Sequence, residues 1–204
     1  MLFRAPTSRL QARPGLVAAA LVLATGASAF AGCATSTKTS APPPGTIIVR
    51  SPQEPDGLNP FLTGMSAAND ACQPIFSGLL AVDDKMQFVP DLATEVPTPK
   101  NGGVVAVGTG MVVTYKLRKG VTWHDGKPFT AKDVAFTAKV LGDPNVIVVE
   151  RDGYDLISKV ETPDPYTVKV TFKEIFAPYL KLFKAILPEH KLAGSADMNK
   201  DPYN

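Results

Sequence analysis

The chain has 204 residues, a length that accommodates one domain or two small ones. Its 19 prolines and 16 glycines, with 45% hydrophobic and 20% charged residues, indicate a loop-rich mixed fold rather than a helical bundle. The net charge is only +2, so there is no electrostatic reason to expect nucleic acid as a partner.

Residues 1–32 are predicted to be a signal peptide. They contain three arginines and no acidic residue, and residues 16–30 (LVAAALVLATGASAF) are apolar or small throughout. That run has the length of a signal's hydrophobic region and is short for a bilayer-spanning anchor. The segment ends in FAGC, and small residues before Cys33 resemble the bacterial lipobox, although Phe30 stands where leucine is usual. We expect Cys33 to be lipidated; the alternative is an ordinary cleaved signal peptide with an incidental cysteine.

Residues 33–45 are predicted to be a disordered tether. They are polar and rich in proline (CATSTKTSAPPPG), so they cannot pack a core. The chain has two cysteines, and a lipidated Cys33 leaves Cys72 without a disulfide partner. Cys72 lies in an apolar stretch and is expected to be a buried small hydrophobe.

Residues 46–204 follow the predicted tether, and the first half of this stretch contains short predicted elements. Residues 46–50 (TIIVR) form a β-branched run that predicts a buried strand. Apolar residues at helical spacing predict a helix over residues 66–77, which Pro74 kinks or ends early. Two apolar runs, residues 79–82 and 86–89, flank the polar sequence DDK and predict a β-hairpin.

Residues 97–110 read as a loop that contains an apolar insert, residues 104–107, and alternation over residues 111–117 predicts a strand. Residues 130–141 give the clearest helix, because Thr130 can cap it and Asp133 completes an approximate capping box.

Two further strands are predicted over residues 157–161 and 167–172, around a Pro-Asp-Pro turn. Pro178 fits the first turn of a helix over residues 179–184. Helices and strands are mixed without a strict βαβ rhythm, which predicts an α+β (mixed α/β) class.

Five blocks resemble, in the same order, conserved elements of bacterial extracellular solute-binding protein family 5, the receptors for oligopeptides, dipeptides and nickel. The longest, residues 115–134, is similar to the family pattern F-x-L-R-x-G-V-x-F/W-H-D-G-x-P-x-T-A-x-D-V almost position for position. The blocks are LNP at 58–60, IFSGLL at 75–80, VPDLATE at 89–95, YKLRKGVTWHDGKPFTAKDV at 115–134 and VETPDPYTV at 160–168.

The resemblance implies a receptor with no catalytic residue, no cofactor and no metal site of its own. Family members trap a peptide or a related solute, such as a nickel chelate, between two lobes and deliver it to ABC permease subunits in the membrane. They are more than twice this length, so residues 46–204 are expected to form part of the first lobe with its flanking subdomain, and the second lobe is expected to be missing. A single wall should bind solute weakly, because enclosure supplies most of the burial.

The resemblance also places ligand contacts on Gly64, Met65 and Ser66, in the stretch that follows the LNP element and borders the cleft in peptide-binding relatives. Backbone pairing with an extended peptide would tolerate many side chains there. The alternative interpretation is an ordinary loop before a helix.

Residues 123–126 (WHDG) invite a metal or catalytic interpretation, but a metal site needs three or four converging ligands and the only other histidine is His190. We expect a tight turn at Asp125 and Gly126 with Trp123 packed under it. The basic residues Lys116, Arg118 and Lys119 are expected on a solvated face, the alternative being a permease contact.

Two other functions were weighed against the receptor. A secreted lipoprotein enzyme is disfavoured because no nucleophile elbow, zinc helix motif or plausible triad is present. A lipid-anchored surface interaction module that has lost solute binding stays open. The receptor interpretation places the protein at the outer face of the cytoplasmic membrane or in the periplasm.

Overall fold

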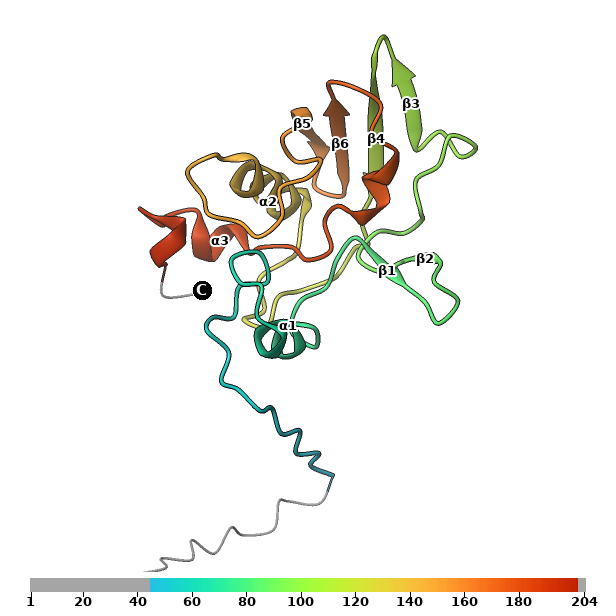
Figure 1. Ribbon diagram of the computed structural model, residues 1–204. Coiled ribbons are helices and arrows are strands. Elements are labelled where there is room, and N and C mark those ends of the chain that lie inside the picture. Colours follow the sequence, from blue (N-terminus) through green and yellow to red (C-terminus); the bar gives the residue numbers. More distant parts are fainter. Residues whose placement is uncertain (1–44, 202–204) are drawn as a thin grey trace, which may run out of the picture. The chain divides into compact units, whose positions relative to one another are not determined.

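The computed structural model describes residues 45–201 (Figure 1). The chain divides into two units, Met1–Ile48 and Val49–Asn204, and the fold below is that of the second. Cys33, the predicted signal peptide and nearly all of the predicted tether lie outside the described residues. Among the described residues, no helix is both long and apolar enough to cross a membrane.

A four-stranded antiparallel sheet is the centre of the fold. Its strands are β3 (Val104–Val107), β4 (Gly110–Lys116), β5 (Ile157–Asp164) and β6 (Thr167–Phe172). Their order across the sheet is β3-β4-β6-β5, so the hairpins β3–β4 and β5–β6 meet along β4 and β6 (Figure 1). The mixed helix and sheet class predicted from the sequence is confirmed.

One face of the sheet supplies the core. Alternate residues of β4 and β6 are fully buried and lie opposite one another, as in the pairs Val113–Val170 and Tyr115–Val168. This is the period of two expected for a strand with one covered face. Helix α2 (Ala131–Gly142) packs against β5 and β6. Phe183 adds its ring edge-on to Tyr115, with 5.9 Å between ring centroids.

Helix α2 begins as the sequence predicts. Thr130 accepts a hydrogen bond from the Lys132 N–H, and the Asp133 carboxylate accepts one from the Thr130 N–H at 2.9 Å, which forms the capping box. The second oxygen of Asp133 accepts from the Glu189 N–H at 3.0 Å. The same carboxylate therefore starts the helix and holds a segment from the far end of the chain, where helix α3 (Glu189–Leu192) follows.

A smaller hairpin precedes the main sheet in the sequence. Strands β1 (Leu80–Val82) and β2 (Phe88–Pro90) are antiparallel, as predicted. Helix α1 (Ser66–Cys72) covers only the first part of the predicted helix and ends before Pro74, whose ring and missing N–H oppose continuation. Cys72 is buried, as expected.

Three sequence predictions are wrong. Residues 46–50 are not a strand, and Ile47 and Val49 are 88% and 87% exposed; a strand needs a hydrogen-bonded neighbour, and no strand of the described chain pairs with this run. The apolar insert expected in a loop is strand β3, which pairs with β4 through a tight turn. The helix expected over residues 179–184 is instead the 3₁₀ helix η1 (Ala177–Lys181), with Pro178 in its first turn.

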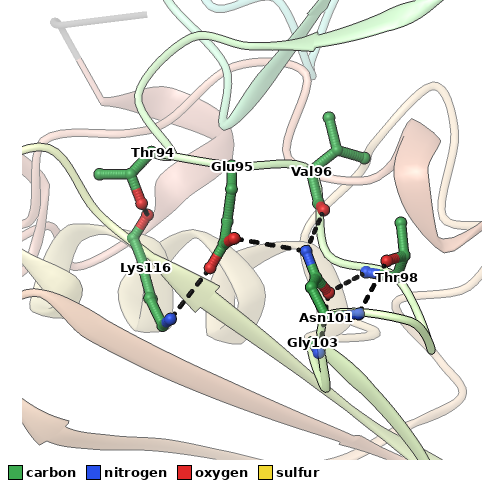
Figure 2. Close-up of polar contacts among 7 residues, drawn as sticks. All are labelled: Thr94, Glu95, Val96, Thr98, Asn101, Gly103 and Lys116. Carbon is green, nitrogen blue, oxygen red and sulfur yellow. Dashed lines mark hydrogen bonds and ion pairs between the residues drawn. The ribbon is translucent and has the colours of Figure 1, made fainter.

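Asn101 organises the loop that leads into β3 (Figure 2). Its side-chain oxygen accepts hydrogen bonds from the N–H groups of Thr98 and Gly103, at 2.8 and 3.0 Å. Its amide group donates to the Val96 carbonyl at 2.9 Å and lies 3.4 Å from Glu95 Oε2. One exposed side chain thus contacts four polar groups of a loop that has no strand-to-strand hydrogen bonds of its own.

Candidate functional site

Gly64, Met65 and Ser66 lie at the start of helix α1, where Met65 is the N-cap residue in extended conformation. The buried side chain of Thr63 fixes this start: its hydroxyl donates to Asp56 Oδ1 at 2.5 Å and accepts from the Met65 N–H at 3.1 Å. Gly64 and Ser66 are exposed and Met65 is half-buried. The segment is therefore a fixed helix start with exposed residues on both sides of Met65.

The LNP element forms a turn over residues 60–62, just before this segment. The buried Asn59 accepts the Phe61 N–H on its side-chain oxygen at 3.1 Å and the Leu62 N–H on its carbonyl at 3.2 Å. An Asn that bonds to its own following backbone builds a turn of this kind. Asn59 was recognised only as part of a motif, and the structure gives its physical role.

A second loop, residues 146–151, borders the turn. The Val149 N–H donates to the Phe61 carbonyl at 2.9 Å. A side chain at Gly64 would stand 3.8 Å from Val149 Cγ1, an ordinary van der Waals distance. Arg151 secures this loop, because its guanidinium donates to the carbonyls of Leu141, Asp143 and Val146, the Asp143 bond being 2.7 Å long. Sequence reasoning did not find this loop, since its apolar residues carry no motif.

A hollow of about 350 Å³ opens beside this loop. Its lining combines aromatic and aliphatic groups with both signs of charge, and it includes none of Gly64, Met65 and Ser66. The lining residues are Phe61, Glu150, Asp152, Tyr154, Phe176, Pro178, Lys181, Leu182 and Lys184.

The polar groups of the hollow are a buried phenol and several exposed charged side chains. The hollow has no histidine, cysteine or serine among its lining residues. Burial raises the pKa of Tyr154, and the Tyr154 hydroxyl accepts the Phe183 N–H at 2.7 Å, so this phenol stays neutral and occupied. Lys184 pairs with Glu150 at 3.2 Å on the exposed rim. The hollow thus combines apolar walls with a rim whose Lys184 and Glu150 charges are paired with each other.

The turn at residues 123–126 forms as predicted. The Gly126 N–H donates to the Trp123 carbonyl at 2.9 Å, and Gly126 has φ +82°, which favours glycine. His190 Nε2 lies 2.9 Å from Asp125 Oδ2, and Lys191 Nζ lies 3.1 Å from it. The hydrogen bond from His190 is the largest of the causes that hold the pKa of Asp125 well below its usual range.

Within residues 45–201 no group of three or more histidine, cysteine, aspartate and glutamate side chains could hold a metal ion. The basic residues on β4 and after it are on an exposed face, as expected. Lys116 pairs with Glu95 at 3.0 Å, and Lys119 Nζ lies 5.6 Å from the centroid of the Tyr166 ring. The side chains of Lys116 and Lys119 therefore both contact other residues of the same chain.

The family model for bacterial extracellular solute-binding proteins, family 5 Middle, matches residues 87–203. Protein XP55 of Streptomyces lividans is 31% identical over 160 residues, which are 78% of this chain and 27% of that protein. NikZ from Campylobacter jejuni, in complex with Ni(L-His), is similar in structure with a TM-score of 0.63 and 28% identity over 74% of this chain and 29% of NikZ.

The oligopeptide-binding protein AppA from Bacillus subtilis, in complex with a nonapeptide, has a TM-score of 0.60 and 28% identity over 71% of this chain and 28% of AppA. The chain thus spans somewhat less than a third of the length of these relatives, and its fold corresponds to part of one lobe of a periplasmic binding protein. From the family match and the shared fold together, this chain belongs to the bacterial extracellular solute-binding proteins, family 5.

Proposed function

We propose that this chain contributes one wall of the substrate-binding component of an ABC importer, which binds a peptide, or a related solute such as a nickel chelate, outside the membrane. In that role the protein would deliver its solute to the permease subunits. The support is family membership together with relatives that hold a nonapeptide and Ni(L-His). Residues 46–204 would form the partial first lobe with its flanking subdomain.

The solute contact is assigned to Gly64, Met65 and Ser66 at the start of helix α1. The observation that carries this assignment is the fixed, open start of helix α1: Thr63 accepts a hydrogen bond from the Met65 N–H, and Gly64 is exposed and has no side chain. Backbone presented in this way can pair with an extended peptide of almost any sequence.

Lipidation of Cys33 would hold the protein at the outer face of the cytoplasmic membrane, and the polar residues 34–45 would serve as a tether. Expression of the full chain and of Cys33→Ser in a bacterial host, with labelled palmitate, tests the anchor. We expect label and membrane association only in the parent chain. Equal label in both would contradict lipidation at this residue.

Chemical-shift mapping by NMR tests the solute contact, because it detects binding too weak for calorimetry. With the full chain and a mixture of short peptides, we expect the largest amide shifts at Gly64, Met65 and Ser66. Gly64→Phe should abolish those shifts by occupying the open face, whereas Gly64→Ala should retain them, since its methyl group meets Val149 at ordinary contact distance. Shifts confined to other surfaces would reject the assignment, and no shift with peptides or nickel–histidine would favour the surface interaction module.

A further inference from the structure

The sequence Asn101-Gly102 lies in the loop before β3, apart from the proposed solute contact, and is the only Asn-Gly pair in the chain. An asparagine followed by glycine can lose its side-chain nitrogen as ammonia without an enzyme. The backbone nitrogen of the next residue attacks the side-chain amide carbon, and glycine has no side chain to hinder the approach. Asparagine is for this reason a thermolabile residue.

The reacting groups of this pair are open to water. Asn101 and Gly102 are both exposed, and a Cβ atom built on Gly102 would meet nothing within 4 Å. The Gly102 N–H makes only a long hydrogen bond, 3.4 Å, to the Pro99 carbonyl. The attacking nitrogen is therefore weakly engaged, and the water that completes the reaction has access.

The side-chain amide of Asn101, in contrast, is held in place (Figure 2). Its oxygen accepts hydrogen bonds from the Thr98 and Gly103 N–H groups, and its nitrogen donates to the Val96 carbonyl. Closing a ring between Asn101 Cγ and the Gly102 nitrogen requires the side chain and the peptide group to rotate together. The hydrogen bonds to the amide oppose that rotation, so they slow the reaction while the loop is closed.

We propose that Asn101 is a site of spontaneous deamidation, slow while the loop is closed, whose product cannot restore the closed loop. The Gly102 nitrogen loses its proton to solvent and forms a bond to Asn101 Cγ. The bond from Cγ to the amide nitrogen breaks, and that nitrogen takes up a proton and leaves as ammonia. Water then opens the resulting succinimide at one carbonyl to give aspartate, or at the other to give isoaspartate. The reaction consumes water, releases ammonia and needs no oxidant or cofactor.

The product has lost the contacts that held the loop. An aspartate at this position places an oxygen where the amide nitrogen lies 2.9 Å from the Val96 carbonyl oxygen and 3.4 Å from Glu95 Oε2. Two acceptors then face each other, and two carboxylates of like charge repel. Isoaspartate in addition inserts an extra carbon into the backbone. Deamidation would therefore record, irreversibly, that the loop has opened.

Prolonged incubation of the full chain in heavy-oxygen water, followed by peptide mass spectrometry, tests the proposal, since only conversion during the incubation labels the product. We expect conversion at Asn101 and none at Asn145, which is also exposed but is followed by the branched Val146. Urea should speed conversion at Asn101 roughly ten- to thirtyfold, because the two hydrogen bonds to its oxygen open. An unlabelled Asn101 in the folded chain after many unfolded-state lifetimes, or equal rates in both states, would overturn the proposal.

Gly102→Ala and Gly108→Ala form a matched pair of variants. Both glycines have a positive φ, +73° and +59°, and open space at Cβ, but only Gly102 supplies the attacking nitrogen. In urea, where neither variant has to fold, Gly102→Ala should slow conversion at Asn101 several-fold and Gly108→Ala should leave it unchanged. Equal rates in the parent and both variants would overturn the mechanism. Converted protein, separated by ion exchange, should unfold at a lower urea concentration than the parent, and equal stability would reject the effect of the product on the loop.

Discussion

The carboxylate of Asp125 lies 2.9 Å from His190 Nε2, although 65 residues separate them in sequence. The contact joins the Trp123 turn to helix α3, and Lys191 reaches the same carboxylate oxygen at 3.1 Å. The turn, which by sequence is a local structure, is therefore also one of the places at which the last part of the described chain is attached.

Acid is expected to weaken this attachment. The pKa of Asp125 is lowered in the folded chain, chiefly by the hydrogen bond from His190, so the folded state favours the charged carboxylate. Its contribution to stability is present above the ordinary aspartate pKa of about 4 and is lost as the pH falls toward the lowered value. Thermal unfolding of Asp125→Asn should show a lower midpoint than the parent at neutral pH, with the difference shrinking in acid. A difference that stays constant with pH would contradict this linkage.

Thr137 is expected to be the most sensitive polar residue of helix α2. It is fully buried, donates to the Asp133 carbonyl at 2.8 Å and accepts from the Leu187 N–H at 2.9 Å. Thr137→Val keeps the shape but leaves the Leu187 N–H unpaired, which should lower the free energy of unfolding by about 1–3 kcal/mol. Urea unfolding measures this. Thr137→Ser retains the hydroxyl and should lose less; an equal loss in both variants would assign the effect to packing.

Asn101 is expected to stabilise the loop before β3 through its side-chain oxygen. Asn101→Ala removes the acceptor for the Thr98 and Gly103 N–H groups and should lower the free energy of unfolding by about 1 kcal/mol. Asn101→Asp keeps that acceptor but loses the donor to Val96 and adds a charge near Glu95. Chemical denaturation of both variants separates the two functions. If the alanine variant is as stable as the parent, the network in Figure 2 does not stabilise the loop.

Strand β3 is expected to promote self-association, because it is an edge strand without a charge, a proline or a bulge. Val105 and Val107 are 51% and 56% exposed. Val105→Lys should therefore raise the concentration at which aggregation begins, measured by light scattering, without lowering the unfolding midpoint. Ile175→Lys is the matched control, since Ile175 is 66% exposed but lies outside any strand. An equal gain in both would indicate a general effect of charge.

The other edge of the sheet is protected by its sequence. Strand β5 has two register irregularities, a Lys159–Glu161 ion pair at 2.7 Å and a proline near its end. Such features discourage pairing with another strand.

Local chemistry could be predicted from the sequence, and contacts between distant residues could not. The cap at Thr130 and Asp133 and the hairpin at residues 79–89 depend on neighbours in sequence, and both are confirmed. The strand expected at residues 46–50 depends on a pairing partner, which apolar β-branched residues do not specify. Strand β3 lies in a stretch that the sequence predicts to be a loop, whereas its pairing with β4 decides its structure.

The candidate site likewise contains residues that the sequence marks and residues that it does not. The resemblance assigns ligand contacts to Gly64, Met65 and Ser66, which stays a prediction, and the loop at Val149 beside Gly64 has no sequence signature. The contact between Asp125 and His190 was not predicted either, because only the folded chain brings two such distant residues together. Burial of the Trp123 indole N–H without a hydrogen-bond partner among the described residues is likewise a property of packing.

The order of strands in the main sheet has a consequence for how the chain folds. Hairpins β3–β4 and β5–β6 each close over a short turn, and such hairpins form in microseconds. The pairing of β4 with β6 brings Lys116 beside Thr167, and helix α2 lies in the long loop between them. Closing this loop lowers the entropy of the chain before the β4–β6 contacts can stabilise it. The transition state should therefore contain the β4–β6 seam, so truncating Val113 or Val170 should slow refolding more than truncating residues of the β1–β2 hairpin.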